Sequence, residues 1–209
     1  IGIIIHHQTP LMAGKAERTR QHIIEKAAPF FNKKGYADTS LSDITAATGL
    51  TKGAIYGNFE NKDELALAVF SYNLDRLAGG MLLAMQQQEN AVDQLLAMIR
   101  YYRGVYQQVS VQGGCPVMNA AVEADDNFPA LKVKVKGAVK NWTRTIARTI
   151  DTGKKEGSIR SQTDSGAMAT LLIALIEGGL MLAKLADDAG PLQVTLDRAE
   201  KIIRTELAK

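Results

Sequence analysis

Apolar side chains recur every three or four residues along most of the chain, and this spacing is that of an α-helix. One side of a helix over residues 17–34, for example, would carry Ile24, Ala27, Ala28 and Phe31. No stretch of the sequence alternates convincingly between apolar and polar residues, as a half-buried strand would. The pattern therefore predicts an all-α protein.

Turn and capping residues divide this pattern into about nine helices. Gly35 and Gly49 are placed to end helices, and Ser40, Thr51 and Asn61 are placed to cap the helices that follow. Prolines open three later helices at first-turn positions, where the missing N–H costs nothing. We expect helices over residues 17–34, 41–48, 52–59, from 62 onward, 90–108, 116–124, 129–155, 164–187 and 191–207.

Residues 1–11, IGIIIHHQTPL, fit the rest of the chain poorly. They are apolar but too short to span a bilayer, and they lack the basic leader and cleavage site of a secretory signal. We expect a leader or upstream segment here, with the natural start at Met12. The longest apolar run, residues 167–186, is interrupted by Glu177 and Lys184, so we expect a buried helix rather than a membrane span.

The segment TKGAIYGNF, residues 51–59, points most clearly to a function. A helix here would bury Ile55 and Phe59 together and leave its other face bare. Each glycine inside a helix costs up to about 1 kcal/mol relative to alanine, so two within five residues need a reason. Close approach to the major groove of DNA supplies that reason, since lysine, tyrosine and asparagine reach phosphates and base edges. The outer face carries Lys52, Gly53, Tyr56, Gly57 and Asn58.

Other candidate DNA contacts flank this helix. Hydroxyl groups suited to the DNA backbone come from Thr39, Ser40, Ser42 and Thr51. Lys62 opens the next helix, whose N–H groups suit a phosphate. Between residues 12 and 58 stand seven basic and four acidic side chains, a modest surplus in a chain of net charge +3. The alternative is a tight helical corner with a solvated outer face.

The segment GYADTSLSDITAATGLTKGAIYGNFENKDEL resembles the N-terminal domain of the TetR family of transcriptional regulators. The matching landmarks are Gly35, Tyr36, Thr39, Ser40, Ile44, Gly49, Thr51, Lys52, Gly53, Ile55, Tyr56, Phe59, Lys62 and Leu65. Relatives often carry histidine or tyrosine where Gly57 and Asn58 stand, so the operator sequence stays open.

The resemblance implies a three-helix helix-turn-helix domain over residues 12–62 and a helical ligand-binding and dimerisation domain over residues 63–209. It implies a repressor that binds a pseudo-palindromic operator in double-stranded DNA and is released by a small hydrophobic or electrophilic effector. We expect a homodimer through the last two helices, because the helix over residues 164–187 is apolar nearly all round. The last helix adds a stripe of Leu192, Leu196, Ala199 and Ile203. Packing within one chain is the alternative.

Methionine and aromatic side chains of the second domain suit a deformable apolar pocket, and they suit an ordinary core equally well. The candidate ligand-binding residues are Met98, Tyr102, Tyr106, Cys115, Met118 and Trp142.

Cys115 is a candidate thiol sensor. It stands at a predicted helix N-terminus, where the helix dipole lowers the pKa of a thiol. The segment GGCPVMNAAVE resembles a TetR subgroup that includes the N-ethylmaleimide-responsive repressors, in which a lysine of the eighth helix lies near the cysteine. Lys184 matches that lysine here. The alternative is a small buried residue beside a lysine that extends to solvent.

Other classes of protein fit the sequence less well. An enzyme with Cys115 as nucleophile would need a base, usually histidine, and the histidines are His6, His7 and His22. We see no metal-ligand cluster and no phosphate-binding loop, so we expect no enzyme, no cofactor and no metal. A helical ligand carrier without operator function is a third possibility. The lone cysteine excludes an internal disulfide and suits a cytoplasmic protein.

Overall fold

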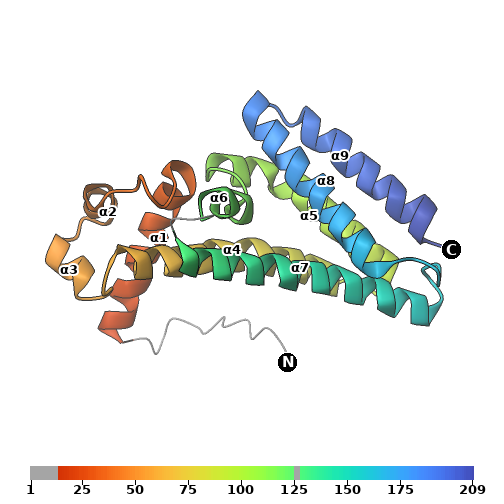
Figure 1. The fold of residues 1–209 in the computed structure, drawn as a ribbon, viewed down its shortest axis with the longest axis horizontal. Coiled ribbons are helices and arrows are strands. Elements are labelled where there is room, and N and C mark those ends of the chain that lie inside the picture. The colour runs from red at the N-terminus through yellow and green to blue at the C-terminus, as the bar shows by residue number, and fades with distance from the viewer. Residues whose placement is uncertain (1–13, 125–127) are drawn as a thin grey trace. The chain divides into compact units, whose positions relative to one another are not determined.

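The computed structural model describes residues 14–124 and 128–209, and its regular structure there is helical apart from an isolated bridge between Ile159 and Ala208. The all-α prediction and the count of about nine helices are confirmed for this part of the chain (Figure 1). The helices are α1 (Lys15–Lys34), α2 (Leu41–Thr48), α3 (Lys52–Tyr56), α4 (Lys62–Gln86), α5 (Ala91–Val111), α6 (Pro116–Glu123), α7 (Pro129–Glu156), α8 (Ser165–Ala186) and α9 (Gly190–Ile202). A π-helical turn, Ile203–Leu207, continues α9.

The chain folds as two compact units, one ending at Gly79 and one running from Gly80 to Lys209. The first unit holds α1 to α3 and most of α4, and the second holds the end of α4 and α5 to α9. Helix α4 therefore belongs to both units. The predicted upstream segment, residues 1–11, lies outside the described residues.

Capping residues set the helix boundaries of the first unit as the sequence predicts. Ser40 Oγ accepts from the Asp43 N–H at 3.1 Å, and the Asp43 carboxylate accepts from the Ser40 N–H, which makes a capping box. Thr51 Oγ1 and Asn61 Oδ1 accept from N–H groups three residues later. Gly49 ends α2 with a φ of 68°, a value that glycine adopts without strain.

Helix α3 is shorter than predicted, because it ends at Tyr56 rather than at Phe59. The Asn58 N–H turns to the carbonyl of Ile55, only three residues back, so the chain tightens and leaves the α-helical path. The Phe59 ring is still buried with Ile55, as the spacing predicts.

Helix α8 is the central helix of the second unit and packs against α7 and α9. Among the described residues it is the one helix long and apolar enough to cross a membrane, judged by length and composition alone. Its inward side is that of a core helix, since Leu172, Ile176 and Ala183 are fully buried. Gly179 allows α9 to approach closely, because a Cβ there would lie 2.0 Å from Thr195 Oγ1.

The apolar stripe of the last helix lies inside the chain. Its four members, Leu192, Leu196, Ala199 and Ile203, have no exposed surface, so this stripe packs within one chain and cannot face a partner. A different stripe, on the outer side of α8, is exposed instead. It consists of Leu171, Met181, Leu182 and Leu185.

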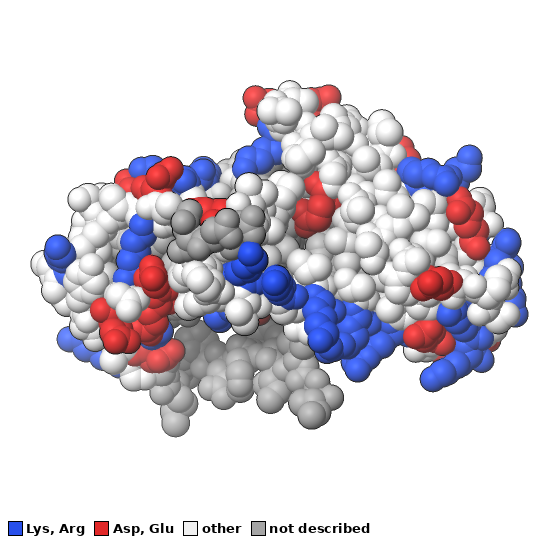
Figure 2. Space-filling model, in the orientation of Figure 1, with Lys and Arg blue, Asp and Glu red and all other residues white. Residues whose placement is uncertain are grey.

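Figure 2 shows that few charged side chains interrupt the surface over α8, while lysine and arginine gather along α7. The exposed basic residues of α7 include Lys134, Lys136, Lys140, Arg144 and Arg148. They form the solvated face of that amphipathic helix.

Candidate functional site

The outer face of α3 is exposed in the first unit. Lys52, Gly53 and Tyr56 all reach solvent, with 44% of Tyr56 exposed. Lys52 Nζ lies 6.0 Å from the centroid of the Tyr56 ring. A Cβ at Gly53 would meet nothing closer than 4.0 Å, so the backbone there is open to approach. Ser42 of α2 is also exposed. These four residues form what we call the α3 face.

Other predicted contact residues are held by the protein itself. Thr39 is fully buried, and its hydroxyl donates to the Gly35 carbonyl at 2.6 Å. Lys62 Nζ donates to the Ala37 carbonyl at 2.7 Å, and Asn58 Nδ2 donates to the Ala54 carbonyl at 2.8 Å. These side chains fix the turns around α2 and α3, whereas the hydroxyls of Ser40 and Thr51 cap those helices. Gly57 is exposed at the end of α3.

Arg20 of α1 fixes the segment after α3, a role that sequence reasoning missed. Its guanidinium carbon lies 4.0 Å from the Phe59 ring centroid, and its Nη atoms donate to the Asn58 carbonyl and, at 2.7 Å, to Glu64 Oε1. The N–H of Glu60 and then Arg20 hold the pKa of the Glu64 carboxyl below its ordinary value. The partners lie 38 to 44 residues from Arg20 in sequence, so no local pattern could reveal them.

Two of the basic side chains in residues 12–58 are neutralised by ion pairs. Lys34 Nζ lies 2.6 Å from Asp43, and Arg20 pairs with Glu64. Lys34 and then Ser40 lower the pKa of Asp43 to about 2. Lys52 has no acidic partner among the described residues, so its charge is available to an anion.

Cys115 in the second unit is fully buried at the start of α6. Its thiol donates to Glu177 Oε1 of α8 at 2.9 Å. Burial and the Glu177 carboxyl raise the pKa of the thiol well above its ordinary value, and they outweigh the lowering by the N–H groups of Val117 and Met118 at the helix N-terminus. The direction is opposite to the one on which the sensor hypothesis depends.

Lys184 lies next to the cysteine-bearing loop, as the resemblance implies, but its ammonium group has another partner. Nζ donates to the Gly113 carbonyl at 2.7 Å and lies 3.5 Å from Asn119 Oδ1. Lys184 is also not among the groups that shift the pKa of Cys115.

Three of the six predicted ligand residues belong to two contacting pairs, Tyr102 with Trp142 and Cys115 with Glu177. The rings of Tyr102 and Trp142 stack with centroids 5.7 Å apart, and Tyr102 Oη donates to Met81 Sδ at 3.8 Å. After burial, the charges of Cys115 and then Glu177 raise the pKa of the Tyr102 hydroxyl group. Glu177 was not predicted to be a site residue, although an acid inside an apolar helix was the signal that could have found it.

The remaining ligand candidates have other surroundings. Met98 is fully buried core, Met118 is half-buried, and Tyr106 Oη donates to the Ala183 carbonyl at 3.2 Å.

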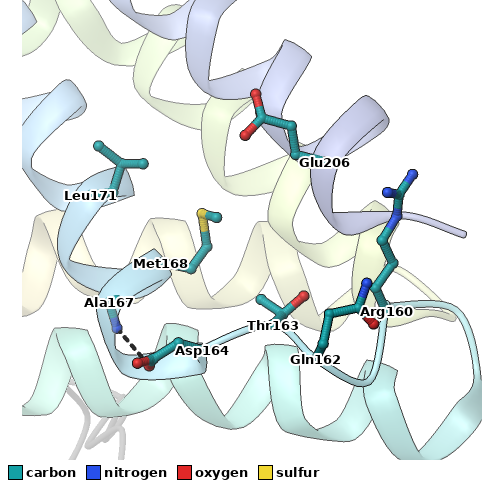
Figure 3. A pocket seen from close by; sticks show the side chains of 8 residues that line it. All are labelled: Arg160, Gln162, Thr163, Asp164, Ala167, Met168, Leu171 and Glu206. Carbon is teal, nitrogen blue, oxygen red and sulfur yellow. Dashed lines mark hydrogen bonds between the residues drawn. The ribbon is translucent and has the colours of Figure 1, made fainter.

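A surface pocket of about 350 Å³ lies where the loop between α7 and α8 meets the π-helical turn (Figure 3). Its charged side chains are already used, because Arg160 donates to the carbonyls of Thr205 and Ala208, Asp164 caps α8 and Glu206 accepts from Arg198. No predicted ligand residue lines this pocket. Within residues 14–124 and 128–209, no group of three or more histidine, cysteine, aspartate or glutamate side chains is placed to hold a metal ion.

Comparison with known proteins matches both units. Residues 23–69 match the family described as "Bacterial regulatory proteins, tetR family", and residues 91–199 match "Tetracyclin repressor-like, C-terminal domain". A TetR transcriptional regulator from Chloroflexus aurantiacus J-10-FL is 36% identical, with a TM-score of 0.89 over 93% of this chain and 98% of its own. A TetR family regulator from Cytophaga hutchinsonii is also 36% identical, with a TM-score of 0.86 over 94% and 98%.

A curated relative, the HTH-type transcriptional repressor DhaR of Mycobacterium sp. (strain GP1), is 27% identical over 83% of this chain and 86% of its own length. The family matches cover a helix-turn-helix unit with an exposed α3 face and a helical second unit with a buried polar cluster. The chain therefore belongs to the TetR family of transcriptional regulators.

Proposed function

We propose that this regulator is a repressor that binds a pseudo-palindromic operator as a homodimer in the cytoplasm. The α3 face carries the proposal, since it offers an open backbone at Gly53, an exposed Tyr56 and a Lys52 that has no acidic partner in the part of the chain that the structure describes. A lysine of this kind can reach a phosphate or a guanine edge, and a bare backbone can approach the groove closely. Two such faces would read half-sites about 34–36 Å apart.

The proposed dimer forms through α8 and α9. The outer stripe of α8, Leu171, Met181, Leu182 and Leu185, is exposed, and Val194 of α9 is 70% exposed. A stripe on one helix can meet its own copy across a two-fold axis, which gives an isologous interface. Burial of these side chains against a second chain would remove the largest exposed apolar groups of α8 from water.

The proposed effector binds in the second unit and weakens operator binding. An effector can do this only if it binds better to a conformation in which the α3 faces no longer match the operator. Helix α4 begins at Lys62 in the first unit and ends at Gln86 in the second, so it connects the two covalently as one continuous helix. The proposed functional domains are residues 12–62 and 63–209.

The buried, hydrogen-bonded Cys115 favours a reversible pocket ligand over a thiol-reactive electrophile as the effector. A thiolate is the reactive form of cysteine, and both burial and Glu177 disfavour it. Sensing through Cys115 and Lys184 is therefore the second candidate for induction.

Binding to DNA from immediately upstream of the gene tests the proposed function, with affinity measured across a series of salt concentrations. Lys52→Ala is expected to weaken binding and to lower the slope of log affinity against log salt by about one, because one phosphate contact is lost. Lys155→Ala removes an exposed lysine of the second unit and is the matched control. Equal affinity and equal slope in the two variants would refute the role of the α3 face.

A further inference from the structure

Glu177 is a half-buried acid whose carboxyl group, within the described residues, lacks a complete set of partners. Oε1 accepts from the Cys115 thiol, while Oε2 is buried without a hydrogen-bond partner among the described residues. No basic side chain of the described chain forms an ion pair with it or shifts its pKa, which burial raises. A buried carboxyl is normally paired with a cation or fully hydrogen-bonded, so an exception calls for an explanation.

A second unpartnered polar group belongs to Trp142. Its indole Nε1 is buried and has no acceptor among the residues that the structure describes. A buried indole N–H usually finds an acceptor. The Trp142 ring stacks on Tyr102 at an interplanar angle of 26°.

Tyr102 joins these two groups into one cluster. Its ring stacks on Trp142, and the charges of Cys115 and Glu177 raise the pKa of its hydroxyl group. Within the described residues, the cluster thus contains an acceptor without a donor, a donor without an acceptor, and two stacked aromatic rings. We name it the Glu177 cluster and define it as Tyr102, Cys115, Trp142 and Glu177.

We propose that the Glu177 cluster binds a small organic ammonium ion that also carries an oxygen acceptor. This proposal rests on the proposed function, since the ammonium ion would be the effector. The ammonium group would donate to Glu177 Oε2 and supply the positive charge that the described residues do not provide. The oxygen would accept from Trp142 Nε1, and aromatic faces attract cations.

A neutral ligand would satisfy the hydrogen bonds but would leave the carboxylate without a counter-charge. A preference for a charged ligand therefore distinguishes the proposed site from an ordinary apolar pocket. It also makes charge, rather than size, the property that selects the ligand.

The test compares two molecules of nearly the same shape, 2-amino-1-phenylethanol and 1-phenylethane-1,2-diol. The first carries an ammonium group where the second carries a hydroxyl. Trp142 is the only tryptophan of the chain, so its fluorescence reports binding at the cluster without a label. We expect a saturable change with the amine and an affinity at least about tenfold higher than that of the diol.

Glu177→Gln is expected to abolish this preference for the amine. Glu156→Gln removes an exposed acid at the end of α7 and is expected to keep it. Equal affinity for amine and diol, a preference that survives Glu177→Gln, or no saturable response to the amine would each overturn the proposal.

Thermal unfolding without ligand gives a second, independent readout. If the missing partner of Glu177 comes from outside the chain, Glu177→Gln should raise the melting temperature, because it removes an unpaired buried acid. A lower melting temperature would instead show that the carboxyl stabilises the empty protein, which contradicts the proposal.

Operator binding is measured separately on the same preparations, with Lys52→Ala as the reference for lost binding. Amine binding without any DNA binding would refute the proposed function and leave the ligand site intact. DNA binding without amine binding would refute the ligand site alone.

Discussion

Two adjacent glycines of α8 allow the close packing of α8 and α9 to be measured. A Cβ at Gly179 would lie 2.0 Å from Thr195 Oγ1, 3.0 Å from Leu192 Cδ1 and 3.2 Å from Leu192 Cα. A Cβ at Gly178 would meet nothing within 4 Å. Both positions are in the same helix, so an alanine at either gains the same helix propensity, about 1 kcal/mol.

Steric clashes then make the stabilities of Gly179→Ala and Gly178→Ala different. Rotation of Thr195 could relieve its clash but would break its hydrogen bond to the Leu192 carbonyl, which measures 3.0 Å. The contact with Leu192 Cα is to backbone, so it can be relieved only if the helices move apart. Overpacking of this kind costs about 1–3 kcal/mol. Gly179→Ala should therefore be less stable than Gly178→Ala by about 1–3 kcal/mol.

Urea unfolding monitored by circular dichroism measures this difference. Gly178 lies on the same side of α8 as the exposed stripe, so the measurement should be repeated at several protein concentrations to detect any effect on dimer formation. Gly137→Ala of α7, where a Cβ would also meet nothing within 4 Å, is a second control away from that stripe. The packing argument fails if Gly179→Ala is as stable as both controls.

Three further predictions concern single side chains. Cys115 should react slowly with iodoacetamide at neutral pH in the native protein and quickly after unfolding, as followed by mass spectrometry, because burial and Glu177 raise its pKa; rapid native labelling would contradict this. Burial raises the pKa of Glu177 above its ordinary value of 4.5, so the native state keeps this proton at pH values where the unfolded chain has lost it. The free energy of unfolding should therefore fall as the pH rises from about 4.5 through the pKa of the folded state. The urea midpoint of unfolding is measured at several pH values for the wild type and for Glu177→Gln, and the difference between the two isolates this pH dependence. A difference that does not change with pH would be evidence against it. Ser40→Ala should lower the free energy of unfolding by about 1 kcal/mol through the lost α2 cap, whereas Ser42→Ala, with an exposed side chain, should change it little; equal losses would refute the capping role.

The helices were predictable because their signals are local. Apolar spacing, the caps at Ser40, Thr51 and Asn61, and the glycine ends lie within a few residues of each boundary that they set. The early end of α3 was missed because the spacing of Ile55 and Phe59 fits a helix and also fits a tightened turn that buries the same two side chains.

The candidate sites were less predictable, because their geometry depends on distant partners. Sequence places Asn58 and Lys62 beside α3, but it cannot show that both side chains turn to backbone carbonyls. Sequence likewise places Cys115 at a helix N-terminus, whereas its thiol is buried and donates to an acid 62 residues away, and both raise its pKa.

The α3 helix divides its tasks between its two sides, and this has an evolutionary consequence. Ile55 and Phe59 carry the packing of the segment and are almost completely buried, while the outward residues Lys52, Gly53 and Tyr56 contribute little to the core. Under the proposed function, substitutions on the outward side can therefore change the preferred DNA sequence with little loss of stability. After gene duplication, a copy of this protein could acquire a new operator by a few mutations without first passing through a poorly folded intermediate.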